Sequence, residues 1–166
     1  MGAAFLGLGS NLGGREENLE RALRLLQARG FRLTRRSAVY ETEPVGGPPQ
    51  ADYLNLAAGG DWQGEPEALL AACLSVEAEM GRVRLERFGP RRIDVDLLLF
   101  GDLVRTGALE LPHPRLHERR FVLLPLAEIA PGAVHPVLGA SVAELLARCP
   151  DLSRVSKHAV LEHPSR

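Results

Sequence analysis

The sequence predicts an α+β fold with a ferredoxin-like β-α-β-β-α-β core, in which helices pack on a mainly antiparallel sheet. Stretches with strand patterns alternate with stretches of helical periodicity in that order. The chain has 166 residues, 45% of them hydrophobic and 25% charged, which is typical of a globular domain with a real core. We expect one domain over residues 1–166, with an extra hairpin and helices after the core.

The first half of the chain supplies three predicted strands and a helix. Residues 3–9 form a short apolar strand, and apolar positions at i, i+3, i+4 and i+7 predict a helix over 15–29 that Gly30 ends. Residues 31–42 and 53–62 follow as strands that can pair as a hairpin. In the second strand one face carries Tyr53, Asn55 and Ala57 and the other carries Leu54, Leu56 and Ala58. The segment between them is rich in glycine and proline and predicts a loop over 45–50.

The second half begins with a helix that Pro66 opens, and its apolar stripe ends at Gly81. A polar loop over 82–92 leads into a strand over 92–100 and a short hairpin over 101–112. Two more helices are expected: one covers residues 121–129 despite Pro125, and the other starts at the capping box formed by Ser141 and Glu144.

Charge and composition exclude several classes of function. The net charge is −1 and aromatic residues make up 5%, so an RNA-binding module is disfavoured and no general attraction to nucleic acid or anionic membranes is expected. No apolar stretch reaches about 18 residues, which excludes a membrane span, and no signal peptide is seen at the N-terminus. Cys73 and Cys149 show no metal-binding or redox spacing. We expect a cytoplasmic monomer.

The most informative motif is Asp94-x-Asp96 inside an apolar run. In a strand these side chains share a face and lie roughly 6–7 Å apart, a spacing that suits hard cations, and oxygen ligands favour Mg²⁺ over Zn²⁺. The alternative is an edge strand with one wet face. Because residues 97–100 are apolar on both faces, we expect instead a central, buried strand whose carboxylates are offset by cations or arginines.

An arginine-rich loop precedes this strand, with members Arg82, Arg84, Arg87, Arg91 and Arg92. The chain has nineteen arginines and one lysine, so solvent exposure is the better explanation of any single member. As a group they join a helix end to the aspartate strand and must lie near the carboxylates. Guanidinium groups bind phosphate oxygens in bidentate geometry, so the loop favours phosphoryl transfer.

Three further features could bind ligands. His113 stands between two prolines in a rigid backbone and could donate to a phosphate, although a surface turn explains it as well. Asn55 offers a donor and an acceptor to a heterocycle, with Tyr53 and Phe121 as stacking rings, although core packing is normally the better explanation of an aromatic residue such as Phe121. The glycine-rich run 7–13 matches no nucleotide fingerprint and is interpreted as a tight strand-to-helix turn.

Taken together, these motifs resemble the 6-hydroxymethyl-7,8-dihydropterin pyrophosphokinase family along nearly the whole chain. The run Arg87-Phe-Gly-Pro-Arg-Arg-Ile-Asp-Val-Asp96 is the most specific of them. The others are Leu8-Gly-Ser-Asn-Leu12, Tyr40-Glu-Thr-Glu-Pro44, Asp52-Tyr-Leu-Asn55, Glu77 with Gly81-Arg-Val-Arg84, and Pro112-His113 with Arg119-Arg-Phe121.

The resemblance implies an ATP-dependent transferase of folate biosynthesis that moves pyrophosphate to the hydroxymethyl oxygen of the pterin and releases AMP. It implies two Mg²⁺ ions held by Asp94 and Asp96. It further implies that loops 43–50 and 82–92 close over the substrates. The implied catalytic residues are Arg82, Arg91, Asp94 and Asp96; the nucleotide-binding residues are Glu77, Arg84, His113 and Arg119; the pterin-binding residues are Thr42, Pro44, Val45, Tyr53, Asn55 and Phe121.

The sequence departs from the family pattern at Phe88, Leu85, Leu74, Pro114 and Glu43, which affects loop motion and nucleotide affinity rather than the aspartate pair. No dedicated general base is evident, and a metal-bound hydroxyl with Asp96 as the candidate proton acceptor would remove the need for one. Two other functions stay open on the residues alone: a ligand-binding module without catalysis, and a different Mg²⁺-dependent phosphoryl or nucleotidyl transferase.

Overall fold

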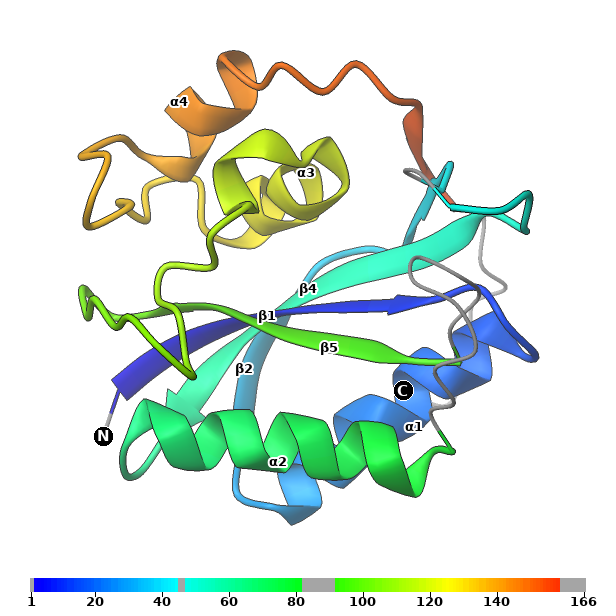
Figure 1. Cartoon of the computed structure of the whole chain (residues 1–166), viewed down its shortest axis with the longest axis horizontal. Helices are drawn as coiled ribbons and strands as arrows, with labels where there is room; N and C mark the ends of the chain where they lie inside the picture. Colours follow the sequence, from blue (N-terminus) through cyan, green and yellow to red (C-terminus); the bar gives the residue numbers. More distant parts are fainter. Residues whose placement is uncertain (1, 45–46, 82–91, 159–166) are drawn as a thin grey trace.

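The structure is a computed structural model that describes residues 2–44, 47–81 and 92–158 (Figure 1). Strand β1 (Gly2–Ser10) pairs antiparallel with β4 (Tyr53–Trp62) on one side and with β5 (Asp94–Phe100) on the other. Beyond β4 the sheet continues through the short strands β3 (Tyr40–Thr42) and β6 (Val155–Lys157), which gives the order β5-β1-β4-β3-β6. Strand β2 (Arg32–Arg36) also pairs with β4.

Helices cover both faces of this sheet. Helices α1 (Arg15–Ala28) and α2 (Pro66–Glu79) lie on one face, and α3 (Arg120–Ile129) and α4 (Val142–Ala147) lie on the other (Figure 1). A single 3-10 turn, Leu116–Glu118, precedes α3. The predicted α+β class with a mainly antiparallel sheet is confirmed, and the finer ferredoxin-like assignment stays a prediction.

The predicted helix stripes become the larger of two cores. In α1 the apolar positions at i, i+3, i+4 and i+7 are all buried, as are Leu69, Cys73 and Val76 of α2 and Met80 directly after it. They pack against the face of β4 that carries Leu54, Leu56 and Ala58, while Ala57 faces the second core beneath α3. Gly30 and Gly81 follow the two helices with positive φ, a conformation that glycine adopts without strain. The division of the β4 side chains between the two cores confirms the alternation predicted for residues 53–62.

The strand predicted over 31–42 is wrong as one continuous element. It is divided into β2 and β3 at Ser37, whose hydroxyl accepts from the Ala57 N–H at 2.9 Å in place of a regular ladder bond. The pairing register also shifts between Leu33 and Arg35, where the strand carries one extra residue against β4. Strand β6 was not predicted, because its three residues are ordered by pairing with the distant β3.

The prediction that the aspartate strand is central is also wrong. Among the described strands, β5 pairs with β1 alone and forms one end of the sheet. Leu97, Leu98 and Leu99 are nevertheless at most 4% exposed, because helical layers cover both faces of the strand. Its outer edge is satisfied by other elements: the His113 N–H donates to the Leu98 carbonyl at 2.9 Å. Burial of both faces therefore does not require a strand on both sides.

The remaining predictions for the C-terminal part hold with small changes. The hairpin predicted over 101–112 consists of one bridge between Arg105 and Leu111. Helix α3 tolerates Pro125, and the capping box of Ser141 and Glu144 starts α4, with both of its hydrogen bonds present. No helix in the described ranges has the length and apolar character needed to cross a membrane.

Candidate active site

The site is built on a part of β1 where two glycines leave one face of the strand without side chains. Gly9 stands between Asn55 of β4 and Asp94 of β5, and Gly7 stands between the next pair, with Asp96 on the β5 side. Since alternate residues of a strand share a face, these two glycines leave an open floor between the polar side chains of the neighbouring strands. A Cβ atom built on Gly9 would lie 2.6 Å from the Asn55 Oδ1, so another residue there would displace the amide.

A cavity of about 570 Å³, called here the face cavity, lies on this floor beneath the start of α3. Five of the six predicted pterin-binding residues line it; the sixth, Val45, falls outside the described residues. Its polar and aromatic lining includes Thr42, Glu43, Gln50, Tyr53, Asn55, Asp94, Asp96, Arg115, Glu118, Arg119, Phe121 and Asp151. Residues from β1, β3, β4, β5 and α3 are thus brought together at one place.

The polar wall of the face cavity is held by a buried hydrogen bond. The Asn55 Nδ2 donates to the Thr42 hydroxyl at 2.7 Å, and these residues are 7% and 2% exposed. β3 and β4 are paired at this point, so the bond joins neighbouring strands and fixes the plane of the amide. A fixed amide presents its donor and acceptor in one orientation, which favours selective binding of a heterocycle edge.

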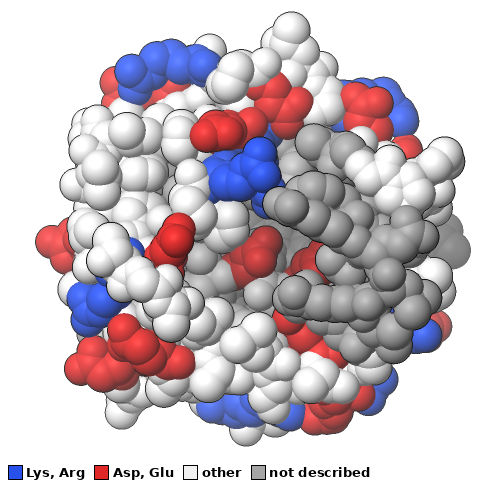
Figure 2. All heavy atoms as spheres, in the orientation of Figure 1, with Lys and Arg blue, Asp and Glu red and all other residues white. Residues whose placement is uncertain are grey.

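The opposite wall carries an arginine and an aromatic ring. The Arg119 guanidinium lies over the Phe121 ring, with its Cζ 5.6 Å from the ring centre, a cation–π contact. Burial and the neighbouring Arg115 lower the pKa of Arg119 below its ordinary value, whereas the carboxylates of Asp96 and Asp94 oppose this shift. Figure 2 shows basic and acidic side chains close together in the hollow of this face. Although the resemblance implies that Arg119 binds nucleotide, it lines the face cavity.

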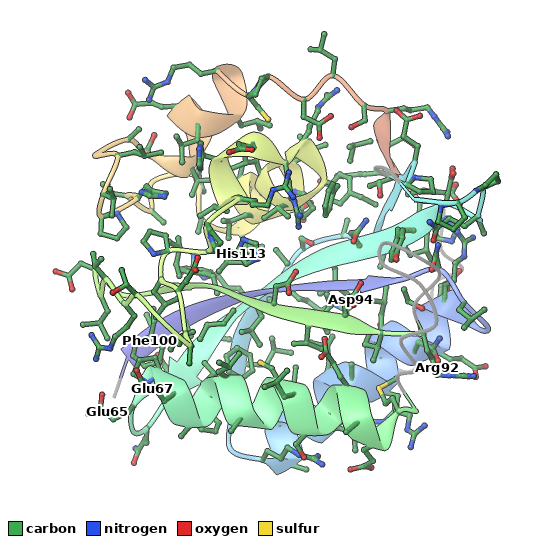
Figure 3. The ribbon with its side chains drawn as sticks, in the orientation of Figure 1. Glu65, Glu67, Arg92, Asp94, Phe100 and His113 are labelled. Carbon is green, nitrogen blue, oxygen red and sulfur yellow. The ribbon has the colours of Figure 1, made fainter. Side chains whose placement is uncertain are left out.

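A second cavity of about 410 Å³, called here the edge cavity, lies beside the outer edge of β5. It is bounded by α2 and by the segment that follows β5, and two predicted nucleotide-binding residues, Glu77 and His113, line it. Asp94 and Asp96 line the edge cavity as well as the face cavity. Figure 3 labels Asp94 at the beginning of β5 and His113 on the α3 side of the strand. The carboxylate pair therefore stands where the two cavities meet.

His113 is neutral in this environment. Burial, followed by the charge of Arg119, lowers its pKa from 6.5 to about 4. Its Nδ1 accepts a hydrogen bond from the Arg115 N–H at 3.2 Å, which places the ring hydrogen on Nε2. A neutral imidazole with a hydrogen on Nε2 can donate to a phosphate oxygen without adding a charge to the site.

Glu77 supports the aspartate strand from below. Its Oε2 accepts the Val95 N–H at 2.8 Å, and the residue is 4% exposed on α2. Val95 lies between the two aspartates, so this bond fixes the backbone that carries them.

Burial, and then the charges of Glu77 and Asp96, raise the pKa of the Cys73 thiol to about 12, which makes it unreactive at neutral pH.

Among the described residues no group of three or more His, Cys, Asp or Glu side chains could hold a metal ion by itself. A carboxylate pair still fits Mg²⁺, because this ion is commonly bound by one or two carboxylates together with substrate phosphates and waters. The arginines implied to act beside the pair, Arg82, Arg84 and Arg91, fall outside the described residues, whereas Arg92 is described and exposed.

Several cavity residues were missed by sequence reasoning. Gly7 and Gly9 lie within the strand predicted over residues 3–9, but their role as the floor of a cavity was missed; their spacing of two was the signal for a strand face without side chains. Gln50, Arg115, Glu118 and Asp151 come from loops and a helix end, and nothing in their local sequence marks them.

Comparison with known proteins identifies the family. The model of the family 7,8-dihydro-6-hydroxymethylpterin-pyrophosphokinase (HPPK) matches residues 5–131. The chain belongs to the HPPK family. It is therefore a transferase of the pyrophosphokinase type, as the earlier resemblance implied, and the site described above lies almost entirely within the matched residues.

Curated HPPK relatives support this across most of the chain. The 2-amino-4-hydroxy-6-hydroxymethyldihydropteridine pyrophosphokinase of Methylorubrum extorquens is 47% identical over 150 residues, covering 89% of this chain and 94% of that protein. The protein of the same name from Bacillus subtilis is 46% identical over 128 residues, covering 76% and 77%. The chain thus spans most of the length of both relatives.

Solved structures agree on the HPPK fold. The Plasmodium falciparum HPPK-DHPS wild type with pteroate superposes with a TM-score of 0.72 at 15% identity, covering 89% of this chain. The chain spans 42% of that longer protein, and at this identity the match shows the fold alone.

Proposed function

We propose that this protein transfers pyrophosphate from ATP to the hydroxymethyl oxygen of 6-hydroxymethyl-7,8-dihydropterin, releasing AMP, as a step of folate biosynthesis. One observation carries the proposal: Asp94 and Asp96 line both the face cavity and the edge cavity. Two substrates bound in the two cavities would meet at this carboxylate pair. Family membership supports the pyrophosphokinase chemistry.

The face cavity suits the pterin. A flat heterocycle would place its polar edge against Asn55 and Thr42, whose mutual hydrogen bond sets the orientation of the amide. Tyr53 and Phe121 line the same cavity and offer aromatic faces for stacking. Asp94 and Asp96 stand on the far side of the glycine floor, where the hydroxymethyl group would point.

The edge cavity suits ATP. Leu70, Leu74 and Leu109 give it an apolar wall for the base, and His113 gives it a neutral donor for the phosphates. Leu74 is 50% exposed, and covering it with the base would contribute to binding. Leucine in place of a polar residue at this position would thus favour apolar packing against the nucleotide.

In the proposed reaction the hydroxymethyl oxygen attacks the β-phosphorus of ATP, and the bond from this phosphorus to the α-β bridging oxygen breaks. AMP leaves with the bridging oxygen, and the hydroxyl proton must be accepted. Asp94 and Asp96 would hold two Mg²⁺ ions, which would offset charge on the attacking and leaving oxygens. Asp96 is the candidate acceptor for the proton. Arg119 would neutralise phosphate charge beside the carboxylates.

The direct test is to incubate the protein with ATP, Mg²⁺ and 6-hydroxymethyl-7,8-dihydropterin and to separate the nucleotides. AMP formed in equal amount to pterin pyrophosphate is the expected result. ADP or free pyrophosphate as the product would indicate a different transferase, and no turnover by folded protein would indicate a binding module. Asp96→Asn with near-normal turnover in Mg²⁺ would rule out the proposed role of Asp96.

A further inference from the structure

The segment that follows α4 contributes two residues to the lining of the face cavity. Residues 150–158, called here the C-terminal strap, run from the end of α4 to β6 and are coloured orange to red in Figure 1. The strap lies beyond residues 5–131, which the HPPK family model matches. Pro150 and Asp151 nevertheless line the face cavity. The strap is therefore close enough to influence what binds there.

At its first end the strap is fixed to the wall formed by α3. The Arg120 N–H donates to the Asp151 Oδ2 at 3.0 Å, and the Arg120 Nη1 donates to the Ser153 carbonyl at 3.4 Å. Asp151 is held in turn by the Ser153 N–H at 2.9 Å and by the Ser153 hydroxyl. Arg120 stands between Arg119 and Phe121, which line the cavity.

In its middle the strap is fixed to the wall formed by β3 and the start of β4. The Arg154 N–H donates to the Glu43 Oε1 at 3.0 Å, and the Arg154 Nη2 lies 2.9 Å from the Asp52 Oδ2. Val155 pairs with Thr42 in the β6–β3 ladder. These contacts therefore reach Glu43 and Thr42, which line the cavity. They also reach Asp52, which directly precedes the lining residue Tyr53.

The far end of the strap is anchored away from the cavity. The His158 N–H donates to the Val39 carbonyl at 2.8 Å, and the His158 Nε2 lies 2.8 Å from the Glu16 Oε1. With both ends held, the strap joins two walls that come from separate parts of the chain. A ligand that must be sandwiched between such walls binds more tightly when their separation is set in advance.

We propose that the C-terminal strap sets the separation of the two walls of the face cavity, with Asp151 and Arg154 as positioning residues for the pterin. This inference rests on the proposed function, since it assigns the pterin to that cavity. The strap touches the face cavity and not the edge cavity, so its effect is on pterin affinity and not on ATP affinity. Arg154 and Asp52 form a surface ion pair, which contributes little to global stability.

The experiment compares Arg154→Glu, Asp52→Arg and the double exchange, with Asp151→Ala as a variant at the other wall. Arg148→Ala is the matched control, because its guanidinium bonds to the Glu144 carbonyl of its own helix. KM for the pterin, KM for ATP, kcat and Tm are measured for each. Arg154→Glu and Asp151→Ala should raise KM for the pterin about three- to tenfold, the size expected for losing one charged contact.

The same variants should leave KM for ATP within twofold and Tm within a few degrees, and the double exchange should recover most of the pterin affinity. An unchanged KM for the pterin in both Arg154→Glu and Asp151→Ala would overturn the inference. Equal rises in both KM values would also overturn it, because general loosening would then explain the effect. Binding of the pterin alone, followed by its fluorescence, judges the strap separately if wild-type protein forms no AMP.

Discussion

The face cavity and the edge cavity share Asp94 and Asp96 but are built in different ways. The face cavity stands on the regular part of the sheet, and its polar groups are fixed by hydrogen bonds between strands, such as that from Asn55 to Thr42. The edge cavity lies beyond the last strand and is bounded by a helix face and a connecting segment. One carboxylate pair can serve both because β5 ends the sheet, so its side chains can be approached from the face and from the edge.

Because the two cavities are built differently, we expect them to differ in how strictly they select their substrates. A sheet face with a glycine floor has little freedom to adapt, so it should discriminate strongly between heterocycles. An apolar wall with one neutral donor is less demanding, so the edge cavity should accept different bases more readily. Substitutions confined to one cavity should therefore change one substrate's KM, and substitutions at the shared pair should stop the reaction.

The largest effect is expected at the shared pair. Asp94→Asn and Asp96→Asn each remove a charge that offsets the cations, and turnover should fall on the order of 10³-fold, corresponding to several kcal/mol of transition-state stabilisation. Pterin binding without nucleotide, measured by fluorescence, should change little. A fall in pterin affinity as large as the fall in turnover would show that the pair belongs to the face cavity alone.

The next effect is confined to the face cavity. Gly9→Ala places a Cβ 2.6 Å from the Asn55 Oδ1 and must displace the amide. KM for the pterin should rise at least about tenfold, the cost of one well-placed hydrogen bond to a buried group, while KM for ATP stays within twofold. Gly132→Ala, a change in a loop where a Cβ meets nothing within 4 Å and φ is not positive, controls for the loss of a glycine.

A smaller effect is expected at Glu77, which supports the shared pair. Glu77→Ala leaves the buried Val95 N–H without its partner and should lower the free energy of unfolding by about 1–3 kcal/mol, measured by urea denaturation. Glu77→Gln retains an acceptor oxygen and should restore most of this stability. If Glu77→Gln instead matches Glu77→Ala in turnover while remaining stable, the charge of Glu77 acts on the cations directly.

The smallest effect concerns the pH dependence of the edge cavity. The pKa of His113 is lowered from 6.5 to about 4 by folding, so the unfolded chain binds this proton first as pH falls. His113 therefore contributes stability that is fully present above pH 6.5 and is lost as pH falls toward 4. His113→Gln should lose less stability than wild type over this window in urea titrations. An identical slope for both proteins would contradict a neutral, buried His113.

Much of the fold follows from local pattern, and the exceptions have long-range causes. The stripes of α1 and α2, the alternation of β4 and the capping box of α4 are encoded within a few residues of one another. The division at Ser37 depends on a bond to Ala57, and β6 depends on β3, so neither could be read from its own segment. The position of β5 was misjudged because burial by helices and burial by strands leave the same apolar pattern.

The candidate site was predictable where residue type limits the chemistry. Paired carboxylates and an asparagine between apolar positions pointed to Asp94, Asp96 and Asn55, and all three line the face cavity. The contribution of Gly9 depends on what stands opposite it in two other strands, and that of Asp151 depends on a strap that is bonded to the distant Arg120. Such roles exist only once the chain has folded.

Strand β5 carries one extra residue against β1, and this residue interrupts the alternation of its side chains. One step along β1, from Phe5 to Leu6, corresponds to two steps along β5, from Leu99 to Leu97, so Leu98 and Leu99 both serve the core beneath α3. Deleting Leu98 or Leu99 would restore regular alternation and leave Phe100 and the aspartates on their own faces of the sheet. We therefore expect a deletion of Leu98 to lose the packing of one buried leucine but to keep Asp94 and Asp96 at the two cavities.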